Sequence, residues 1–260
     1  ERETVRTYVQ DKIHLTDKWD LTPSLRYSHY SDYKESTGGN SAGNTNDFNY
    51  SLNTEYMFND KVGMYLGWTK GFRPLRQGDY TTTDYVFNAP LKDEEGNVYT
   101  FGIHYDISDR TTVALHYDWT KTKNAIATLP VLDPNSGDFL LTPINAKEDK
   151  QSINLTLDHQ LNKHVTLSAS YSHMKDKWKS KDGWTLGPES GWDPDDINTS
   201  INHLRPQNHY ALNVSYENAR FYTGLLLNYY TGCSGLAFTD NRFLILDWNA
   251  NYEFANGITA

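Results

Sequence analysis

The sequence contains a single cysteine, Cys233, and no long apolar stretch. One cysteine cannot form a disulfide within the chain, so cysteine usage leaves the redox compartment open. No run of 18 or more apolar residues occurs, which excludes a transmembrane helix. A membrane location is still possible, because the strands of a membrane barrel carry apolar residues only at alternate positions and look polar on average.

Basic residues are also scarce. Lys and Arg total 24 against 33 Asp and Glu, which gives a net charge of −9. Nucleic-acid binding needs clustered Lys and Arg, so we expect no nucleic-acid partner. Aromatic residues are plentiful, with 19 Tyr, 7 Trp and 10 Phe. Tyr and Trp suit membrane–water interfaces, although an ordinary all-β core would also hold them, so the arrangement of strands has to decide.

Apolar and polar residues alternate with a period of two along most of the chain. In the segment 62–69, Val62, Met64 and Leu66 alternate with smaller or more polar neighbours. This period indicates β-strands, since successive side chains of a strand point to opposite faces, and no sustained helical period competes with it. We predict eleven strands and the first residues of a twelfth: about 4–15, 19–28, 48–58, 62–69, 99–107, 113–120, 151–161, 165–172, 209–216, 220–230 and 244–254.

The connections between these strands alternate strictly between short and long. The short ones centre on Asp or Asn, whose side chains favour turns, at 16–17, 59–60, 108–109, 162–163, 217–218 and 256–257. The long ones cover about 31–47, 72–97, 124–146, 175–204 and 231–241. Short periplasmic turns and long extracellular loops are typical of outer-membrane barrels. The predicted fold is therefore all-β, an antiparallel transmembrane β-barrel.

The two faces of the predicted strands suit lipid and water respectively. The face rich in Leu, Val, Trp and Tyr should meet lipid, because the opposite face of Ser, Thr, Asn, Asp and Arg suits only a wet lumen. Aromatic pairs such as Trp19 with Tyr27 flank the apolar stretches, as in interfacial girdles. Asp11 is the exception on the apolar face, and we expect it near the periplasmic rim, where charge costs less.

Four segments resemble the barrel domain of TonB-dependent outer-membrane receptors. YVQDKI at 8–13 leads through a turn to LTPSLRY at 21–27, which is similar to the family's "LTPGLRY" with Ser24 where glycine is usual. MYLGWTKGFRP at 64–74 resembles "LYASYSKGFRAP". NAPLKDE at 88–94 with YTFGI at 99–103 resembles "NPNLKPE…YEVG", and LRPQNH at 204–209 resembles an "RPRH" strand entry.

The resemblance implies a barrel of about 22 strands around an N-terminal plug. Residues 1–260 would form a partial barrel domain, lacking the plug domain, the TonB-box segment and the last strand. The implied function is TonB-energised uptake of a scarce nutrient across the outer membrane, most of all a ferric siderophore or related metal chelate. The implied partners are outer-membrane lipid, the chelate, and the TonB complex acting through the missing N-terminal region. We expect no enzymatic activity and no cofactor.

Two long connections hold candidate ligand-binding residues. In 72–97, Arg73 and Arg76 could pair with an anionic chelate, and Tyr80 and Tyr85 could stack on its rings. An ordinary solvated loop would also contain such residues. In 175–204 the candidates are aromatic, and recognition and a packed loop core remain alternatives: Trp178, Trp184 and Trp192.

Metal and haem sites receive less support. Asp193, Asp195 and Asp196 could hold calcium, but they lack the EF-hand pattern, so solvated acids are favoured. No His and Cys cluster has zinc-site spacing, and we predict no metal site. Haem receptors of the family place a His where 72–91 has none, which disfavours haem, although His173 or His203 could supply one.

Two other functions remain open. A passive porin would share the strand pattern and polar lumen, but it would lack the four receptor-like segments. An outer-membrane lipase would need Ser and His together near the rim, for which Ser31 and His173 are the candidates, with His29 beside Ser31. No acyl-transfer constellation can be assembled from the sequence.

Overall fold

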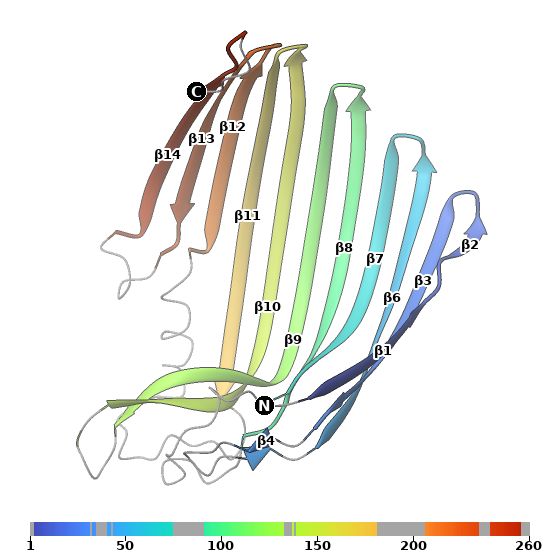
Figure 1. Ribbon diagram of the computed structural model, residues 1–260, viewed down its shortest axis with the longest axis vertical. Helices are drawn as coiled ribbons and strands as arrows, with labels where there is room; N and C mark the ends of the chain where they lie inside the picture. Colours follow the sequence, from blue (N-terminus) through green and yellow to red (C-terminus); the bar gives the residue numbers. More distant parts are fainter. Residues whose placement is uncertain are drawn as a thin grey trace.

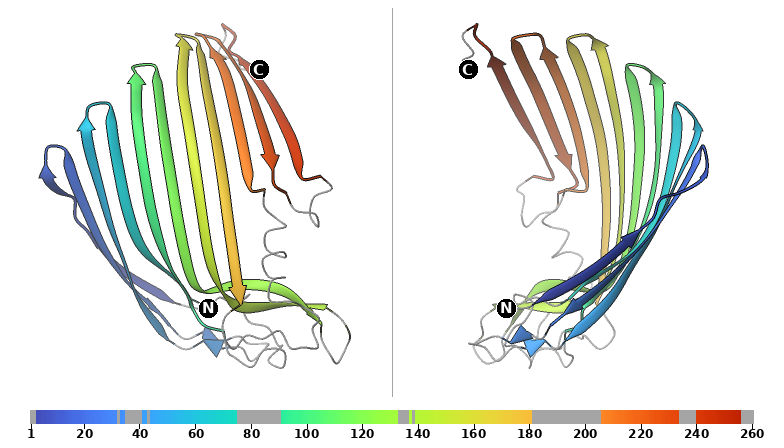
Figure 2. Two further views of the ribbon diagram at one scale, coloured as in Figure 1. Left: turned by 180° about the vertical axis from the view of Figure 1, so that it is seen from behind. Right: turned by 45° about the vertical axis from the view of Figure 1, so that its right-hand side comes forward.

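The computed structural model describes residues 3–31, 33–34, 41–42, 44–74, 91–132, 137, 139–180, 206–233 and 240–255. These residues form one curved antiparallel sheet, and two short strands pair separately (Figures 1 and 2). The strands of the sheet are β1 (Thr4–Gln10), β2 (Ile13–Thr16), β3 (Trp19–Tyr30), β6 (Thr45–Asn59), β7 (Val62–Arg73), β8 (Glu94–Ser108), β9 (Thr111–Leu132), β10 (Phe139–Asn162), β11 (Val165–Ser180), β12 (Asn208–Glu217), β13 (Phe221–Thr231) and β14 (Arg242–Tyr252). The separate pair is β4 (Tyr33–Lys34) with β5 (Ser41–Ala42).

Sheet order follows chain order. It runs β1-β3-β6-β7-β8-β9-β10-β11-β12-β13-β14, with β2 pairing the far part of β3. The sheet is open, because β1 and β14 lie at its two ends and do not pair with each other. Short turns gather at one end of the strands, which is the upper end in Figure 1. The eleven predicted strands and the short turns between them are confirmed, while the last turn and the first residues of the predicted twelfth strand lie outside the described residues. Within the described residues, no helix is long and apolar enough to cross a membrane.

The first predicted strand, 4–15, is interrupted. Strands β1 and β2 both pair with β3 in one continuous register, Gln10 opposite Ser24 and Ile13 opposite Leu21. The interruption lies opposite Pro23, which has no N–H to donate to the ladder. Asp11 therefore falls at the break, where its own N–H still donates to the Pro23 carbonyl at 3.3 Å.

The prediction of a long loop at 124–146 is wrong. Strands β9 and β10 continue through most of this segment as a paired hairpin, with Ala125 opposite Ala146 and Leu132 opposite Phe139. Beyond the sheet this hairpin turns away from the strand direction and crosses the end where the long connections lie (Figures 1 and 2). The bend coincides with Asn124, whose φ of 54° is tolerated by asparagine, and with a register shift between Ala146 and Glu148.

Candidate ligand-facing wall and rim

The outward face of the sheet carries a row of aromatic rings towards the long-connection end. Rings on neighbouring strands touch, with centroids 5.0 Å apart for Tyr50 and Trp68 and 5.6 Å for Tyr99 and Trp119. Across β11 to β13 the row continues through Tyr171, Tyr210 and Tyr229. We call these seven rings the outer aromatic row. Such a row marks the water interface of a membrane barrel, and exposed Leu residues lie on the turn side of it.

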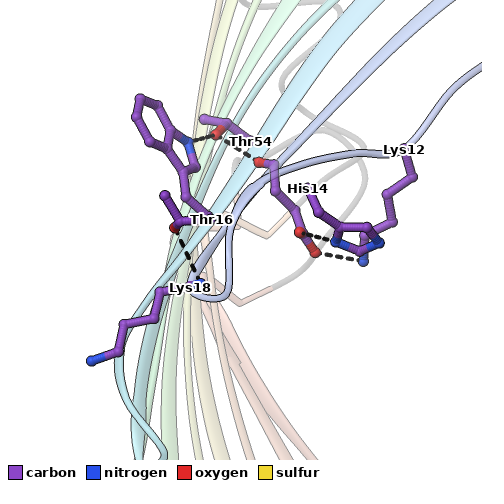
Figure 3. A network of polar contacts seen from close by, with 7 residues as sticks. Lys12, His14, Thr16, Lys18 and Thr54 are labelled. Atoms are coloured by element: carbon purple, nitrogen blue, oxygen red, sulfur yellow. Dashed lines mark hydrogen bonds and ion pairs between the residues drawn. The ribbon is translucent and has the colours of Figure 1, made fainter.

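A second set of aromatic and polar contacts lies at the turn end. The Trp19 indole donates to Thr54 Oγ1 at 2.7 Å, and the Trp248 indole donates to Thr223 Oγ1 at 3.0 Å. Lys12 and His14 both contact the Asp20 carboxylate, at 2.7 Å and 2.6 Å (Figure 3). This end of the sheet thus combines interfacial rings with charged groups that face away from lipid.

The inward face is polar and holds a connected side-chain network. The Tyr65 hydroxyl contacts His116 Nδ1, and His116 Nε2 lies 2.6 Å from Asp118 Oδ2. Thr100 Oγ1 donates to the other Asp118 oxygen at 2.8 Å. Gly102 makes room for this network, since a Cβ at that position would overlap the Tyr65 ring. The network was not predicted from the sequence, although His116 and Asp118, two residues apart on one strand, necessarily share a face.

Further polar groups of the inward face lie where β3 meets β6. Ser24 and Ser51 are hydrogen bonded at 2.6 Å. Nearer the long-connection end, Ser28 and Asn49 are buried, and neither the Ser28 hydroxyl nor the Asn49 amide has a hydrogen-bond partner among the described residues.

Among the predicted ligand residues of 72–97, Arg73 is the one that the structure describes. It ends β7, lies opposite Glu94, and its Nε donates to Glu94 Oε2 at 2.8 Å. Both side chains are about one-quarter exposed, at 27% and 26%. Of the haem candidates, His173 lies on β11. The remaining loop, calcium and haem candidates lie outside the described residues: Arg76, Tyr80, Tyr85, Trp184, Trp192, Asp193, Asp195, Asp196 and His203.

Trp178 was expected in a loop, and that placement is wrong. It belongs to β11, where it is buried and lies opposite Glu148 of β10. Glu148 also accepts a hydrogen bond from Thr122 Oγ1 at 2.7 Å. Burial raises the pKa of the Glu148 carboxyl above its ordinary value, against the opposing effect of that hydrogen bond. Trp178 is therefore packed on the inward face, nearer the long-connection end of the sheet than the outer aromatic row.

The lipase candidates do not meet. Ser31 directly follows β3, and its N–H donates to the Glu3 carbonyl. His173 lies on β11 and contacts Asn208 Oδ1 at 2.8 Å. Five strands lie between β3 and β11 in the sheet, and the six spacings between neighbouring strands amount to roughly 29 Å along the sheet at about 4.8 Å each. Among the described residues, no group of three or more His, Cys, Asp or Glu side chains could hold a metal ion.

Comparisons with known proteins agree with this architecture. The family described as "TonB dependent receptor-like, beta-barrel" matches residues 1–260. An uncharacterised TonB-dependent receptor of Haemophilus influenzae is 24% identical over 181 residues, which is 67% of this chain and 49% of that protein. The chain therefore spans about half the length of that relative.

Two solved structures share the fold. The siderophore receptor PirA of Pseudomonas aeruginosa superposes with a TM-score of 0.65 at 20% identity, over 98% of this chain and 43% of PirA. The copper transporter OprC gives a TM-score of 0.68 at 13% identity, over 96% of this chain and 40% of OprC. With its lipid-suited outer face and polar inner face, the chain belongs to the TonB-dependent receptor β-barrel family of the Gram-negative outer membrane.

Proposed function

We propose that this chain forms part of the barrel wall of a receptor that imports a chelated metal, most of all a ferric siderophore, with energy supplied through TonB. The proposal rests on the difference in polarity between the outward and inward faces of the sheet. The outer aromatic row faces lipid, while Tyr65, His116 and Asp118 form a polar network on the inner face. Family membership and the resemblance to a siderophore receptor support the same function.

In this proposal residues 1–260 are a partial barrel domain, and a plug and TonB-contacting segment belong to the same receptor. The substrate would be held near the ends of the long connections, where Arg73 stands. Its pairing with Glu94 keeps the guanidinium at the rim and leaves part of it exposed. An anionic chelate could then bind beside it by charge-assisted hydrogen bonds. Arg76, Tyr80, Tyr85, Trp184 and Trp192 are proposed as further contacts.

The test is uptake of radiolabelled iron by cells that lack the gene or carry it on a plasmid. We expect chelate-dependent uptake only with the full-length gene, and none when TonB is deleted. Uptake that persists without TonB, together with steady ion conductance of the purified protein, would instead establish a porin.

Copper is the second candidate substrate class, because a copper transporter shares the fold. The same cells supplied with radiolabelled copper distinguish the two metals. TonB-dependent copper accumulation without iron accumulation would favour copper and contradict the siderophore proposal.

A further inference from the structure

Lysine side chains gather on the outward face of β9 to β11, directly beyond the outer aromatic row. Lys121 and Lys123 of β9, Lys147 of β10, and Lys177 and Lys179 of β11 are all exposed. On β11 the intervening Asp176 and Trp178 are buried, as expected for the opposite face. Strand register brings the lysines together, with Lys147 opposite Lys179 and Asp149 opposite both Lys121 and Lys177. We call these five residues the lysine cluster.

The lysine cluster lines a cavity of about 780 Å³. Tyr99 of the outer aromatic row also lines the cavity, and Lys92 adds a sixth ammonium group. A volume of this size falls within the usual range for binding sites of small organic groups, roughly 300–1,000 Å³. The cavity therefore offers both cations and an aromatic surface to one ligand.

Three acids, Glu95, Glu148 and Asp149, line the cavity together with six lysines, and Glu95 lies opposite Lys123. The Asp149 carboxylate accepts a hydrogen bond from the Trp119 indole at 2.8 Å, and Glu148 accepts one from Thr122. Within the described part of the chain, no carboxylate forms an ion pair with Lys121, Lys123, Lys177 or Lys179. Lys121 Nζ instead lies 4.0 Å from the centre of the Trp119 ring, a cation–π contact. The site is thus positively charged overall.

The level of the site relative to the bilayer indicates which kind of ligand it would meet. Tyr99 and Trp119 belong to the interfacial row, so the lysines just beyond them lie at the level of lipid head groups in the outer leaflet. We propose that the lysine cluster binds the phosphate groups of a phosphorylated glycolipid of the outer leaflet, of the lipid A type. The proposal needs only the outer-membrane location of the barrel, so it stands whether or not the chelate-uptake function is correct.

Binding to the full-length protein in detergent tests this proposal, with native mass spectrometry as the measurement. The probes are lipid A with both phosphates, the same lipid without phosphate, and inorganic phosphate alone. Each basic residue at a charged membrane surface is worth about 1 kcal/mol, or about five-fold in affinity. The double variant Lys177→Gln with Lys179→Gln should therefore bind phosphorylated lipid A about 25-fold more weakly, and higher salt should weaken the native protein's binding.

The matched control is Lys61→Gln with Lys163→Gln, two exposed lysines in turns at the opposite end of the sheet, which should bind like the native protein. Heat-modifiable gel mobility confirms that each variant is folded. Equal affinity of the two double variants would overturn the proposal, as would equal binding of the dephosphorylated lipid. Full competition by millimolar inorganic phosphate would assign the site to a free anion instead of a lipid.

Discussion

At the scale of single residues, the inner wall depends on positions that lack a side chain. Gly102 lies opposite Tyr65 in the ladder, and the tyrosine ring covers it. A glycine in a strand costs stability, which the covering ring recovers by packing against the exposed backbone. The ring orientation in turn places the hydroxyl against His116.

Gly102→Val should destabilise the barrel by about 1–3 kcal/mol, the usual effect of overpacking, because the new side chain would force the Tyr65 ring out of place. Urea unfolding of the full-length protein in lipid vesicles measures the change. Gly71→Ala is the matched control, since the nearest atom to a Cβ there is the Gly96 carbonyl at 3.9 Å. Equal unfolding free energies for the two variants would show that Tyr65 moves aside freely.

The buried Glu148 carboxyl should make the stability of the folded protein depend on pH. Its pKa is raised by burial, so the folded state binds a proton more tightly than the unfolded chain does. Its contribution to stability is therefore greatest below the ordinary glutamate pKa and is lost as pH rises through the raised value. Glu148→Gln should raise the thermal midpoint at neutral pH relative to the native protein and leave it nearly unchanged at low pH. A midpoint difference that grows as pH falls would contradict this account.

At the scale of elements, the main departure from expectation is the β9–β10 hairpin. The segment 124–146 was predicted as a long connection, and it contains Pro130 and Pro143, a residue type that is unusual inside a paired strand. The hairpin tolerates both prolines, because beyond the sheet each strand has only one paired edge and the other can face away. The eleven strand positions were predictable, since a period of two is a local property. The bend depends on a local φ and a register shift, which the sequence pattern does not encode.

Asn145 holds this hairpin to the rest of the wall. It is fully buried, its Oδ1 accepts from the Lys92 N–H, and its Nδ2 donates to the carbonyls of Lys92 and Asn124. Removing a side chain with three such bonds leaves buried backbone groups unpaired, which costs about 1–3 kcal/mol each.

Asn145→Ala should therefore loosen the hairpin without unfolding the barrel. Hydrogen exchange should accelerate at 125–132 and 139–146 and stay unchanged in β13. Asn154→Ala is the control, because its side chain accepts one described bond, from Ser172. Exchange that accelerates uniformly over all strands would show that Asn145 supports the whole sheet instead.

Some residues of the candidate site could be predicted from single strands, and others could not. Arg73 was accessible to sequence reasoning because it follows a recognisable strand and precedes a long connection. The partners that matter to it and to the lysine cluster lie on neighbouring strands, as Glu94 does for Arg73. Such pairs depend on register between segments far apart in sequence, and a single sequence contains no direct record of register. The Trp178 misplacement has the same origin, since β11 continues beyond the predicted strand.

At the scale of the whole molecule, the bilayer acts as a depth-dependent solvent for the outer face. Leu66 lies on that face of β7, between Met64 and Trp68, and is about half exposed in the sheet alone, at 45%. Its surroundings in the membrane are hydrocarbon, where an ionised side chain has no partner.

Leu66→Arg should cost about 2–4 kcal/mol of folding free energy in lipid vesicles, as arginine does near the bilayer midplane. Asp60→Arg, in the turn at the end of the same hairpin, should change it by less than about 1 kcal/mol. Urea titration in vesicles measures both. A similar cost at the two positions would mean that the outward face of β7 is not immersed in lipid.

The order of the strands also has a consequence for how the wall assembles. The main path of the sheet follows chain order, so each strand on it pairs only with its neighbours on that path. The contacts that build the sheet are therefore local in sequence. Forming a local contact closes only a short loop, so each step loses little chain entropy. Chains with local contacts fold faster than chains with distant pairings. The wall can therefore grow one hairpin at a time, with each completed hairpin serving as the template edge for the next.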